Sequence, residues 1–268
     1  MKALIKYPGA KWRIAEWITG FFQDHHSYLE PYFGSGAVLF HKKPSRIETV
    51  NDLDGEVVNF FSCLRADPER LARLVSLTPY ARQEYEAAYS EHTEPFQRAH
   101  SFLVRLQMGH GFRTCGERVG WKLDVQGRER AYAVRDWNRL PERLLQAAER
   151  LKEVQIESRP ALDVIERFNS PKVLIYCDPP YLLGTRCRRQ YRCEMTDAEH
   201  LALLETLRSH KGKVIISGYE SAMYDDMLRG WHKETTGNLA NNSRKRTEVL
   251  WMNFEQKVKS NGENDMEN

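Results

Sequence analysis

The sequence lacks the features that define several classes of protein. Its 5 cysteines among 268 residues are odd in number and form no Cys-x-x-Cys pair, which argues against a disulfide framework and against a zinc site. No apolar run approaches the length of a membrane-spanning helix, and the N-terminus has no apolar stretch of the kind found in a signal peptide. We therefore expect no bound metal, no membrane association and a cytoplasmic location.

A strong excess of charge of one sign is also missing. The 40 Lys and Arg residues face 37 Asp and Glu residues, so the formal net charge is only +3, and bulk charge does not indicate a nucleic-acid ligand. The distribution of charge is more informative, because residues 186–192 carry four arginines and no acid, and residues 98–150 hold eleven basic against six acidic residues. Such local basic segments can contact phosphate, although a solvated loop is equally consistent with the sequence.

Short apolar runs predict the strands of an α/β protein. They lie at residues 28–30, 47–50, 154–156, 173–177, 213–217 and 249–252. Helical stretches at 12–22, 161–168 and 197–209 separate most of them, and Thr196 with Glu199 has the spacing of a capping box. This alternation predicts a Rossmann-like, mostly parallel sheet with helices on both faces and with ligands at the carboxyl ends of the strands.

The alternation breaks between the second and third predicted strands. Helices are predicted at 69–75, 83–89 and 95–107, and residues 109–130 have the Gly, Arg and aromatic content of a loop or hairpin. We interpret residues 56–149 as a helical insertion into one discontinuous domain of residues 1–55 and 150–256. The polar tail, residues 257–268, is predicted to be disordered.

Three segments have the composition of a ligand site near the N-terminus. Residues 30–37 (Glu-Pro-Tyr-Phe-Gly-Ser-Gly-Ala) follow the first strand and are predicted to open a helix at 38–40. A dinucleotide fingerprint requires a third glycine where Leu39 stands, so a ligand without pyrophosphate fits better. The second strand ends in Asn51-Asp52, where an α/β fold places an acid for ribose hydroxyls. The turn at residues 6–11 adds Tyr7 and Lys11, although each segment alone is also typical of an ordinary turn.

The most specific signal is Asp178-Pro179-Pro180-Tyr181, directly after the apolar run 173–177. The consecutive prolines donate no hydrogen bonds, so their carbonyls remain as fixed acceptors. An amine on an aromatic base is a poor nucleophile because its lone pair is conjugated into the ring. A carboxylate and a carbonyl that accept its two N–H bonds would free that lone pair, while a tyrosine ring would hold the base in line with a methyl donor.

Four motifs in this order resemble the Dam-type (D12 class) adenine-N6 DNA methyltransferases over about residues 5–254. They are residues 6–11, residues 30–36, Asn51-Asp52 and Asp178–Tyr181. The resemblance implies a Rossmann-like fold with a helical DNA-recognition insertion, S-adenosylmethionine as the methyl donor and an adenine flipped out of double-stranded DNA. It further implies a bacterial or phage-encoded protein that works as a monomer, with a cognate restriction enzyme as a candidate partner.

The resemblance also assigns roles to residues of this chain. Asp178 would lie between the cofactor and the target amine, the Pro179 carbonyl would be the second acceptor, and Tyr181 would stack on the base. Lys11 would bind the methionine carboxylate of the cofactor, and Asp52 its ribose. The residues implied to contact the cofactor are Tyr7, Lys11, Phe33, Gly34, Gly36, Asp52 and Asp178. A polar loop at residues 241–248 is expected either to close over the flipped base or to be a solvated turn.

The insertion departs from the family pattern. Members that read GATC carry an Arg- and Asn-bearing hairpin here, and residues 111–122 show no clear match to it, so GATC specificity is not transferred. Basic side chains are nevertheless candidates for groove or phosphate contacts. In and near the insertion loop they are Arg113, Arg118, Lys122 and Arg128; after the catalytic motif they are Arg186, Arg188, Arg189 and Arg192.

The sequence also allows other interpretations of the target and of the activity. The target could be cytosine N4, a base in RNA or a glutamine amide, although the first typically has Ser, and the last Asn, where Asp178 stands. A DNA-binding regulator that has lost activity is the alternative outside enzymes. The intact motif at 178–181 together with Lys11 argues against that loss.

Overall fold

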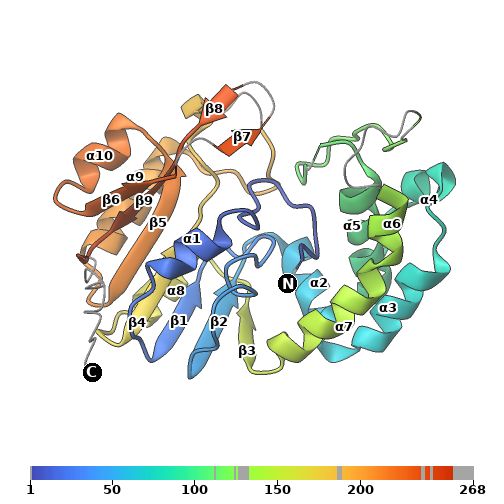
Figure 1. Cartoon of the computed structure of the whole chain (residues 1–268), viewed down its shortest axis with the longest axis horizontal. Helices are drawn as coiled ribbons and strands as arrows, with labels where there is room; N and C mark the ends of the chain where they lie inside the picture. The colour runs from blue at the N-terminus through green and yellow to red at the C-terminus, as the bar shows by residue number, and fades with distance from the viewer. Residues whose placement is uncertain are drawn as a thin grey trace, which may run out of the picture.

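A mixed seven-stranded sheet forms the centre of the structure. The computed structural model describes residues 2–111, 113–123, 125, 133–185, 189–236, 239–241 and 244–255, with the side chains of 239–241 and 244–246 excepted. The strands follow the order β3-β2-β1-β4-β5-β9-β6 across the sheet (Figure 1). Their bounds are β1 Ser27–Glu30, β2 Ile47–Asn51, β3 Val154–Glu157, β4 Val173–Cys177, β5 Lys213–Tyr219, β6 His232–Thr235 and β9 Glu248–Met252.

The strand order creates a place for a ligand. Strands β3, β2, β1, β4 and β5 are parallel, whereas β9 runs antiparallel to both β5 and β6. The chain runs outward from β1 to β2 and β3, and then returns to β4 on the other side of β1. The loops after β1 and β4 therefore diverge, and in such sheets the crevice between them binds ligands. The expected Rossmann-like α/β fold is confirmed.

All six predicted strands are present, but three further strands were missed. Strand β6 has the sequence His-Lys-Glu-Thr, a polar edge strand with no apolar run to reveal it. Strands β7 (Leu239–Asn241) and β8 (Arg244–Arg246) form a separate two-stranded sheet. The prediction of a loop at residues 241–248 was therefore wrong, because this segment contains β8 and the first residue of β9.

Both faces of the sheet are buried under helices. Alternate strand residues point to opposite sides, so Tyr28, Tyr176 and Leu250 join one core cluster, whereas their neighbours Leu29, Ile175 and Trp251 join another. Helices α1 (Ala15–Gly20) and α2 (Gly55–Ala66) contribute to the first cluster, and α8 (Ala161–Arg167), α9 (Asp197–Arg208) and α10 (Ala222–Met227) to the second.

The described chain between β2 and β3 is mostly helical, apart from the loop after Met108 and the short connections between helices. Its helices are α2, α3 Pro68–Leu77, α4 Arg82–Ala87, α5 Pro95–Met108, α6 Ala133–Asn138 and α7 Leu140–Leu151. Helices α3 to α7 stand beside the sheet, at the right of Figure 1. The predicted helices at 69–75, 83–89 and 95–107 are confirmed, and prolines at the first turns of α3 and α5 explain where these helices begin. Helix α2 joins the two parts, because its Phe61 packs on Phe33 beside the sheet at 4.6 Å between ring centroids.

Two helix predictions in the N-terminal part need correction. The predicted helix opening at 38–40 is a series of turns in which the Phe40 N–H donates to the Gly36 carbonyl at 3.0 Å. Pro44 lies four residues further on and disfavours helical backbone at the residue before it, and β2 begins at Ile47, so no helix extends there. The helix predicted at 12–22 is shorter than expected and spans only Ala15–Gly20.

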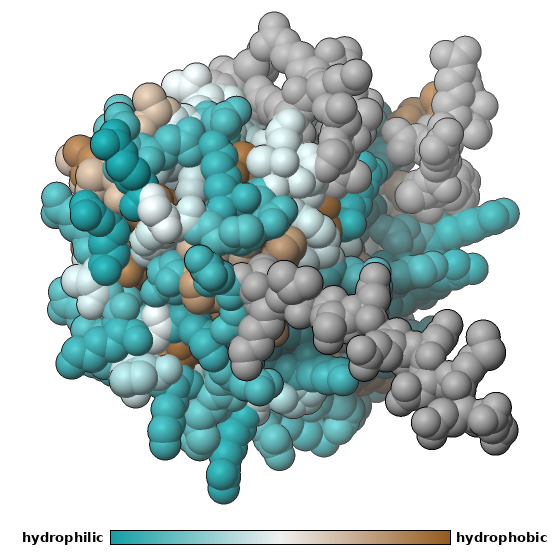
Figure 2. All heavy atoms as spheres, turned by 60° about the vertical axis from the view of Figure 1, so that its left-hand side comes forward, coloured by the Kyte–Doolittle hydropathy of each residue, from teal (hydrophilic) through white to brown (hydrophobic). Residues whose placement is uncertain are grey.

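The loop after α5 links back on itself. Gly109 and Trp121 form an isolated antiparallel bridge, in agreement with a loop or hairpin. Over the face seen in Figure 2, hydrophilic residues dominate and hydrophobic ones are scattered among them. Within the described ranges, no helix is long and apolar enough to cross a membrane.

Candidate active site

Asp178 lies at the carboxyl end of β4, and two neighbours fix its carboxylate. The Ser217 hydroxyl on β5 donates to Oδ1 at 2.8 Å, and the Lys11 ammonium contacts the same oxygen at 2.9 Å. Tyr176 on β4 hydrogen-bonds to Ser217 at 3.1 Å and so continues the network into the sheet. In the described part of the chain both contacts fall on Oδ1, so Oδ2 keeps its lone pairs for another donor.

Lys11 is a buried ammonium shared by two acids. Its side chain is 7% exposed, and Nζ lies 2.9 Å from Asp178 Oδ1, 3.3 Å from Glu248 Oε1 and 2.8 Å from the Gly9 carbonyl oxygen. Burial alone would lower the pKa of Lys11, but the Asp178 and Glu248 carboxylates raise it well above its usual value. Lys11 is therefore a permanent cation at this edge of the sheet.

Tyr181 is held on several sides. Its ring packs edge-on against Tyr219 at 4.7 Å between centroids, and the Lys11 ammonium lies 4.7 Å from its centroid. Its hydroxyl donates to Glu248 Oε1. Burial raises the pKa of the Tyr181 hydroxyl far above its usual value, so it remains a donor. The ring thus has a fixed position beside the Lys11 ammonium, which contacts Asp178.

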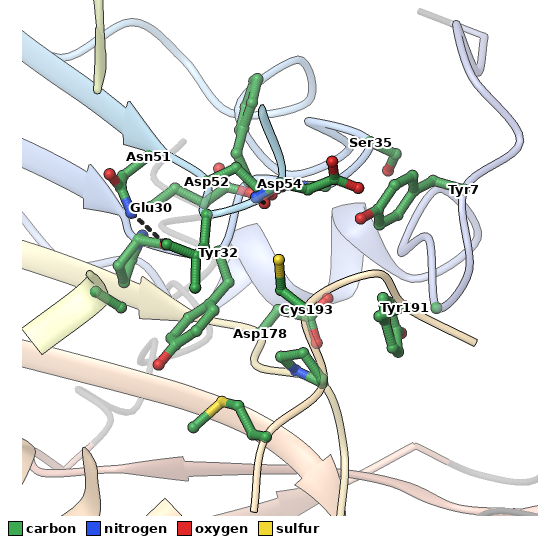
Figure 3. A pocket seen from close by; sticks show the side chains of 18 of the residues that line it. Tyr7, Glu30, Tyr32, Ser35, Asn51, Asp52, Asp54, Asp178, Tyr191 and Cys193 are labelled. Carbon is green, nitrogen blue, oxygen red and sulfur yellow. Dashed lines mark hydrogen bonds between the residues drawn. The ribbon is translucent and has the colours of Figure 1, made fainter. Parts of the chain in front are cut away.

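A cavity opens at the carboxyl ends of β1, β2 and β4 (Figure 3). Figure 3 shows Asp52 and Asp54 after β2 on one side, and Tyr191 and Cys193 on the segment that follows the catalytic motif. Of the residues that the sequence assigned to a cofactor, those in the lining are Tyr7, Lys11, Phe33, Gly34, Asp52 and Asp178. The motif at 178–181 also contributes Pro180.

Gly36 has another place. It adopts φ +68°, and a Cβ there would lie 2.7 Å from the Phe33 ring, so it shapes the turn behind the wall that Phe33 forms. Gly34 also has a positive φ of +48°, and a Cβ there would press on the Tyr7 ring at 3.1 Å. Both glycines therefore keep the backbone close to aromatic rings at the cavity.

Asn51 and Asp52 tie together the loops around the cavity. The Asn51 side chain donates to the Pro31 carbonyl at 3.0 Å, drawn dashed in Figure 3, and accepts from the Arg159 N–H at 2.9 Å. Asp52 accepts from the Gly34 N–H at 2.8 Å and from the Asp54 N–H at 2.9 Å. Burial raises the pKa of Asp52 to about 7, because these backbone donors only partly offset the loss of hydration.

Asp54 was not predicted as a site residue. Its side chain is 2% exposed, and Oδ1 caps helix α2 through the Glu56 N–H at 3.0 Å and pairs with Arg192 Nε at 3.3 Å. Oδ2 is buried without a hydrogen-bond partner among the described residues. Burial raises the pKa of Asp54. A buried acceptor that lines a cavity is suited to a ligand donor such as a hydroxyl or an amine.

The segment 189–195 joins the cavity to the loop at 109–123. Tyr191, Cys193, Glu194 and Met195 line the cavity. The Thr114 N–H donates to the Gln190 carbonyl at 2.8 Å, and the Arg192 N–H donates to the Thr114 hydroxyl at 3.2 Å. Thr114 thus connects the insertion loop to the chain that closes one side of the cavity.

The predicted DNA contacts have mixed surroundings. Arg113 pairs with Glu117 at 2.5 Å, the Arg118 guanidinium lies 5.0 Å from the Tyr89 ring centroid, and the Lys122 N–H donates to the Met108 carbonyl. Arg189 is exposed. Arg128, Arg186 and Arg188 lie outside the described residues, as does the tail at 257–268.

Sequence reasoning missed three residues that contact Asp178, Lys11 or Tyr181. Ser217 and Tyr219 are on β5, and Glu248 opens β9. Ser217 is the last residue of the predicted strand 213–217, and Glu248 is the last residue of the predicted polar loop 241–248, which is a weak signal in each case. Their contacts depend on strand neighbours that lie far away in the sequence.

Comparison with known proteins decides the family. Residues 7–246 match the model of the D12 class N6 adenine-specific DNA methyltransferases. The chain belongs to this family. It is 25% identical over 248 residues to the DNA adenine methylase of Salmonella typhimurium, covering 87% of this chain and 84% of that protein. It is 22% identical over 189 residues to the DNA adenine methylase of Vibrio cholerae serotype O1, covering 67% of this chain and 65% of that protein.

Among solved structures, a SAM-dependent methyltransferase from Agrobacterium tumefaciens aligns with 91% of this chain and 61% of its own, at 10% identity and a TM-score of 0.38. That score is too low to support an argument. The family itself makes this chain an adenine-specific DNA methyltransferase and implies S-adenosylmethionine as its methyl donor.

The cavity fits this methyl donor chemically. Asp52 and Asp54 Oδ2, which has no hydrogen-bond partner among the described residues, offer acceptors for hydroxyls. Lys11 also lines the cavity, but its ammonium already contacts Gly9, Asp178 and Glu248. Tyr7 and Phe33 supply apolar walls for a purine. Within the described ranges, His, Cys, Asp and Glu side chains form no cluster that could hold a metal ion.

Proposed function

We propose that this enzyme methylates N6 of an adenine that has been flipped out of double-stranded DNA into the space beside Asp178. The observation that supports the proposal is the difference between the two oxygens of the Asp178 carboxylate. Lys11 and Ser217 fix Oδ1 at 2.9 and 2.8 Å, which orients Oδ2 toward a ligand donor. An extruded base presents such a donor in its exocyclic amine.

The adjacent residues complete the activation of the amine. In this mechanism Asp178 Oδ2 and the Pro179 carbonyl accept the two N–H bonds, so the nitrogen lone pair leaves the plane of the ring. Tyr181 forms the wall against which the base stacks, and its contacts with Lys11 and Tyr219 hold that wall in place. Because these groups are fixed before the base arrives, little reorganisation is needed in the transition state.

The cofactor residues have separate tasks. Asp52 and Asp54 accept hydrogen bonds from hydroxyls, and Tyr7 and Phe33 pack against the purine. Lys11 lines the same cavity and holds Asp178 and Glu248 in place. Gly34 lets the backbone approach without a Cβ. When bound, S-adenosylmethionine supplies the methyl group as an electrophilic carbon.

We assign target recognition to the insertion, residues 56–149, within a catalytic domain of residues 1–55 and 150–256. The supporting observation is the position of the loop 109–123, which carries Arg113, Arg118 and Lys122 and bonds through Thr114 to the segment that lines the cavity. Basic side chains on that loop and Arg189 after the catalytic motif provide the charge for phosphate contacts.

The test is the methylation state of DNA in a host that lacks its own methyltransferases. Plasmid from cells that express the chain is expected to contain N6-methyladenine in one short fixed motif, found by modification-sensitive sequencing. Plasmid from cells that express Asp178→Ala serves as the control and is expected to contain none. Methylation confined to cytosine or to RNA would reject the proposal.

A further inference from the structure

Glu248 joins the parts of the active site. We propose that Glu248 is a positioning residue for methyl transfer, which holds the Lys11 ammonium and the Tyr181 ring so that Asp178 keeps one oxygen for the target amine. The inference rests on the proposed function of Asp178. It adds a carboxylate outside the motif, contributed by a strand at the far end of the chain.

The antiparallel strand explains how Glu248 reaches the site. In the parallel strands only the carboxyl ends face the cavity. Strand β9 runs the other way, so its first residue lies at that edge, opposite Tyr219, the last residue of β5. The Glu248 N–H donates to the Thr236 hydroxyl at 3.3 Å, and its carbonyl accepts from the Thr236 N–H at 3.0 Å. The backbone that carries the carboxylate is therefore anchored on the side of β6.

One oxygen of Glu248 receives two contacts. Oε1 accepts from the Tyr181 hydroxyl and lies 3.3 Å from Lys11 Nζ. The Glu248 side chain is 14% exposed, and burial raises its pKa while the Lys11 ammonium opposes that rise. A single carboxylate thus fixes the residue that would stack on the base and the cation beside Asp178.

The donors of Lys11 show why this matters for Asp178. An ammonium has three N–H donors and no acceptor, and Lys11 has three acceptors around it: the Gly9 carbonyl, Asp178 Oδ1 and Glu248 Oε1. Without Glu248, one donor is released into a buried site where the remaining acid is Asp178. A second bond from Lys11 to that carboxylate would occupy Oδ2, the oxygen that the amine needs.

The experiment compares Glu248→Ala and Glu248→Gln with wild type in single-turnover methylation of duplex DNA. Glu248→Ala is expected to lower the methyl-transfer rate about 100-fold, the size of effect produced by misplacing reacting groups. Glu248→Gln keeps an oxygen acceptor without charge and is expected to recover about 10-fold of that loss. Affinities for cofactor and DNA, measured by calorimetry and fluorescence anisotropy, are expected to stay within about threefold of wild type.

The matched control is Glu234→Ala. Glu234 lies on β6, pairs only with His232 at 2.8 Å among the described residues, and is half-exposed. Its rate is expected to equal that of wild type. A second test is the variant Tyr181→Phe. In the double variant with Glu248→Ala, the two losses in methyl-transfer rate should not add fully, because both changes remove the same hydrogen bond.

Three outcomes would overturn the inference. The first is a methylation rate for Glu248→Ala that equals that of Glu234→Ala. The second is a Glu248→Ala variant whose affinities for cofactor and DNA fall as much as its methylation rate, with no recovery in Glu248→Gln. Such a result would indicate a general structural role. If Glu248→Ala does not fold, Glu248→Gln decides, and a wild-type rate for it rejects the inference. Asp178→Ala in the same assay separates the two proposals: if it stays active, the proposed function fails, whereas an inactive Asp178→Ala with a normal Glu248→Ala rejects this inference alone.

Discussion

Two pairs of carboxylates line the same edge of the sheet and have opposite electrostatic surroundings. Asp52 and Asp54, after β2, accept hydrogen bonds from backbone N–H groups. Asp54 also pairs with Arg192 at 3.3 Å. Asp178 and Glu248, at β4 and β9, share the buried Lys11 ammonium. Burial raises the pKa of Asp52 to about 7.

The difference matches two kinds of task. The Asp52 carboxylate is held by neutral N–H donors, and its pKa is about 7. Such a group is suited to accept hydrogen bonds from neutral hydroxyls. A carboxylate that contacts a buried ammonium is held in one orientation, which an acceptor for a reacting amine requires. Carboxylates at one sheet edge thus acquire different chemistry from the groups around them.

The largest effect is expected from Asp178→Ala. Removing the acceptor from the reacting amine should lower methyl transfer by about 10³-fold or more, while the protein stays folded. Transfer of a labelled methyl group to duplex DNA measures the rate, and circular dichroism checks the fold. Asp163→Ala, an exposed acid on α8, is the control. Retained turnover in Asp178→Ala would mean that the amine is activated elsewhere.

Lys11→Met removes the ammonium that Asp178 and Glu248 share. It leaves two carboxylates without their shared ammonium, so the free energy of unfolding is expected to fall by about 3 kcal/mol, as when one partner of a buried pair is removed. Urea denaturation measures the change. Lys152→Met, which removes an exposed partner of Glu149, should change stability by no more than about 0.5 kcal/mol. Equal effects in the two variants would show that the Lys11 site is not buried in solution.

Asp52→Asn tests the pair after β2 through the pH dependence of stability. The folded pKa of about 7 exceeds the unfolded value of about 3.9, so the folded state binds the proton more tightly. The stabilisation from this group is present at low pH and is lost as the pH rises through 7. Unfolding free energies measured from pH 4 to 8 should therefore fall less steeply in Asp52→Asn than in wild type. Parallel curves would contradict the raised pKa.

The smallest effect is expected from the basic segment after Tyr181. Replacing Arg186, Arg188 and Arg189 by Ala should reduce the salt dependence of DNA affinity by about 0.9 in logarithmic slope for each phosphate that is no longer neutralised. Anisotropy titrations at several salt concentrations measure the slope. Arg229→Ala, at an exposed residue just after α10 that pairs with Asp226, is the control. An unchanged slope in the triple variant would remove this segment from the DNA interface.

The sequence was sufficient where the signal is local. The apolar run 173–177 predicted β4, and the motif after it placed Asp178 at the carboxyl end of a central strand. Thr196 and Glu199 form the predicted capping box of α9. In these cases the residues that determine the structure are neighbours in the chain.

The rest depended on contacts between distant segments. Glu248 reaches Lys11 only because β9 is antiparallel to β5, and no local pattern specifies strand direction. Asp54 was passed over in favour of Asp52, since both follow one strand and only tertiary packing leaves an Asp54 oxygen without a partner among the described residues. The turns at 38–40 have helical composition, but the nearby start of β2 prevents a helix.

The bonds of Thr114 have a consequence for the order of events in the catalytic cycle. Because the Gln190 carbonyl and the Arg192 N–H both bond to Thr114, we expect any displacement of residues 189–195 on ligand binding to move the loop that carries Arg113 and Arg118 as well. If DNA binds to this loop as proposed, thermodynamic reciprocity requires that DNA change the affinity for the methyl donor by the same factor by which the donor changes the affinity for DNA. Measuring either affinity with and without the other ligand would then give one coupling free energy.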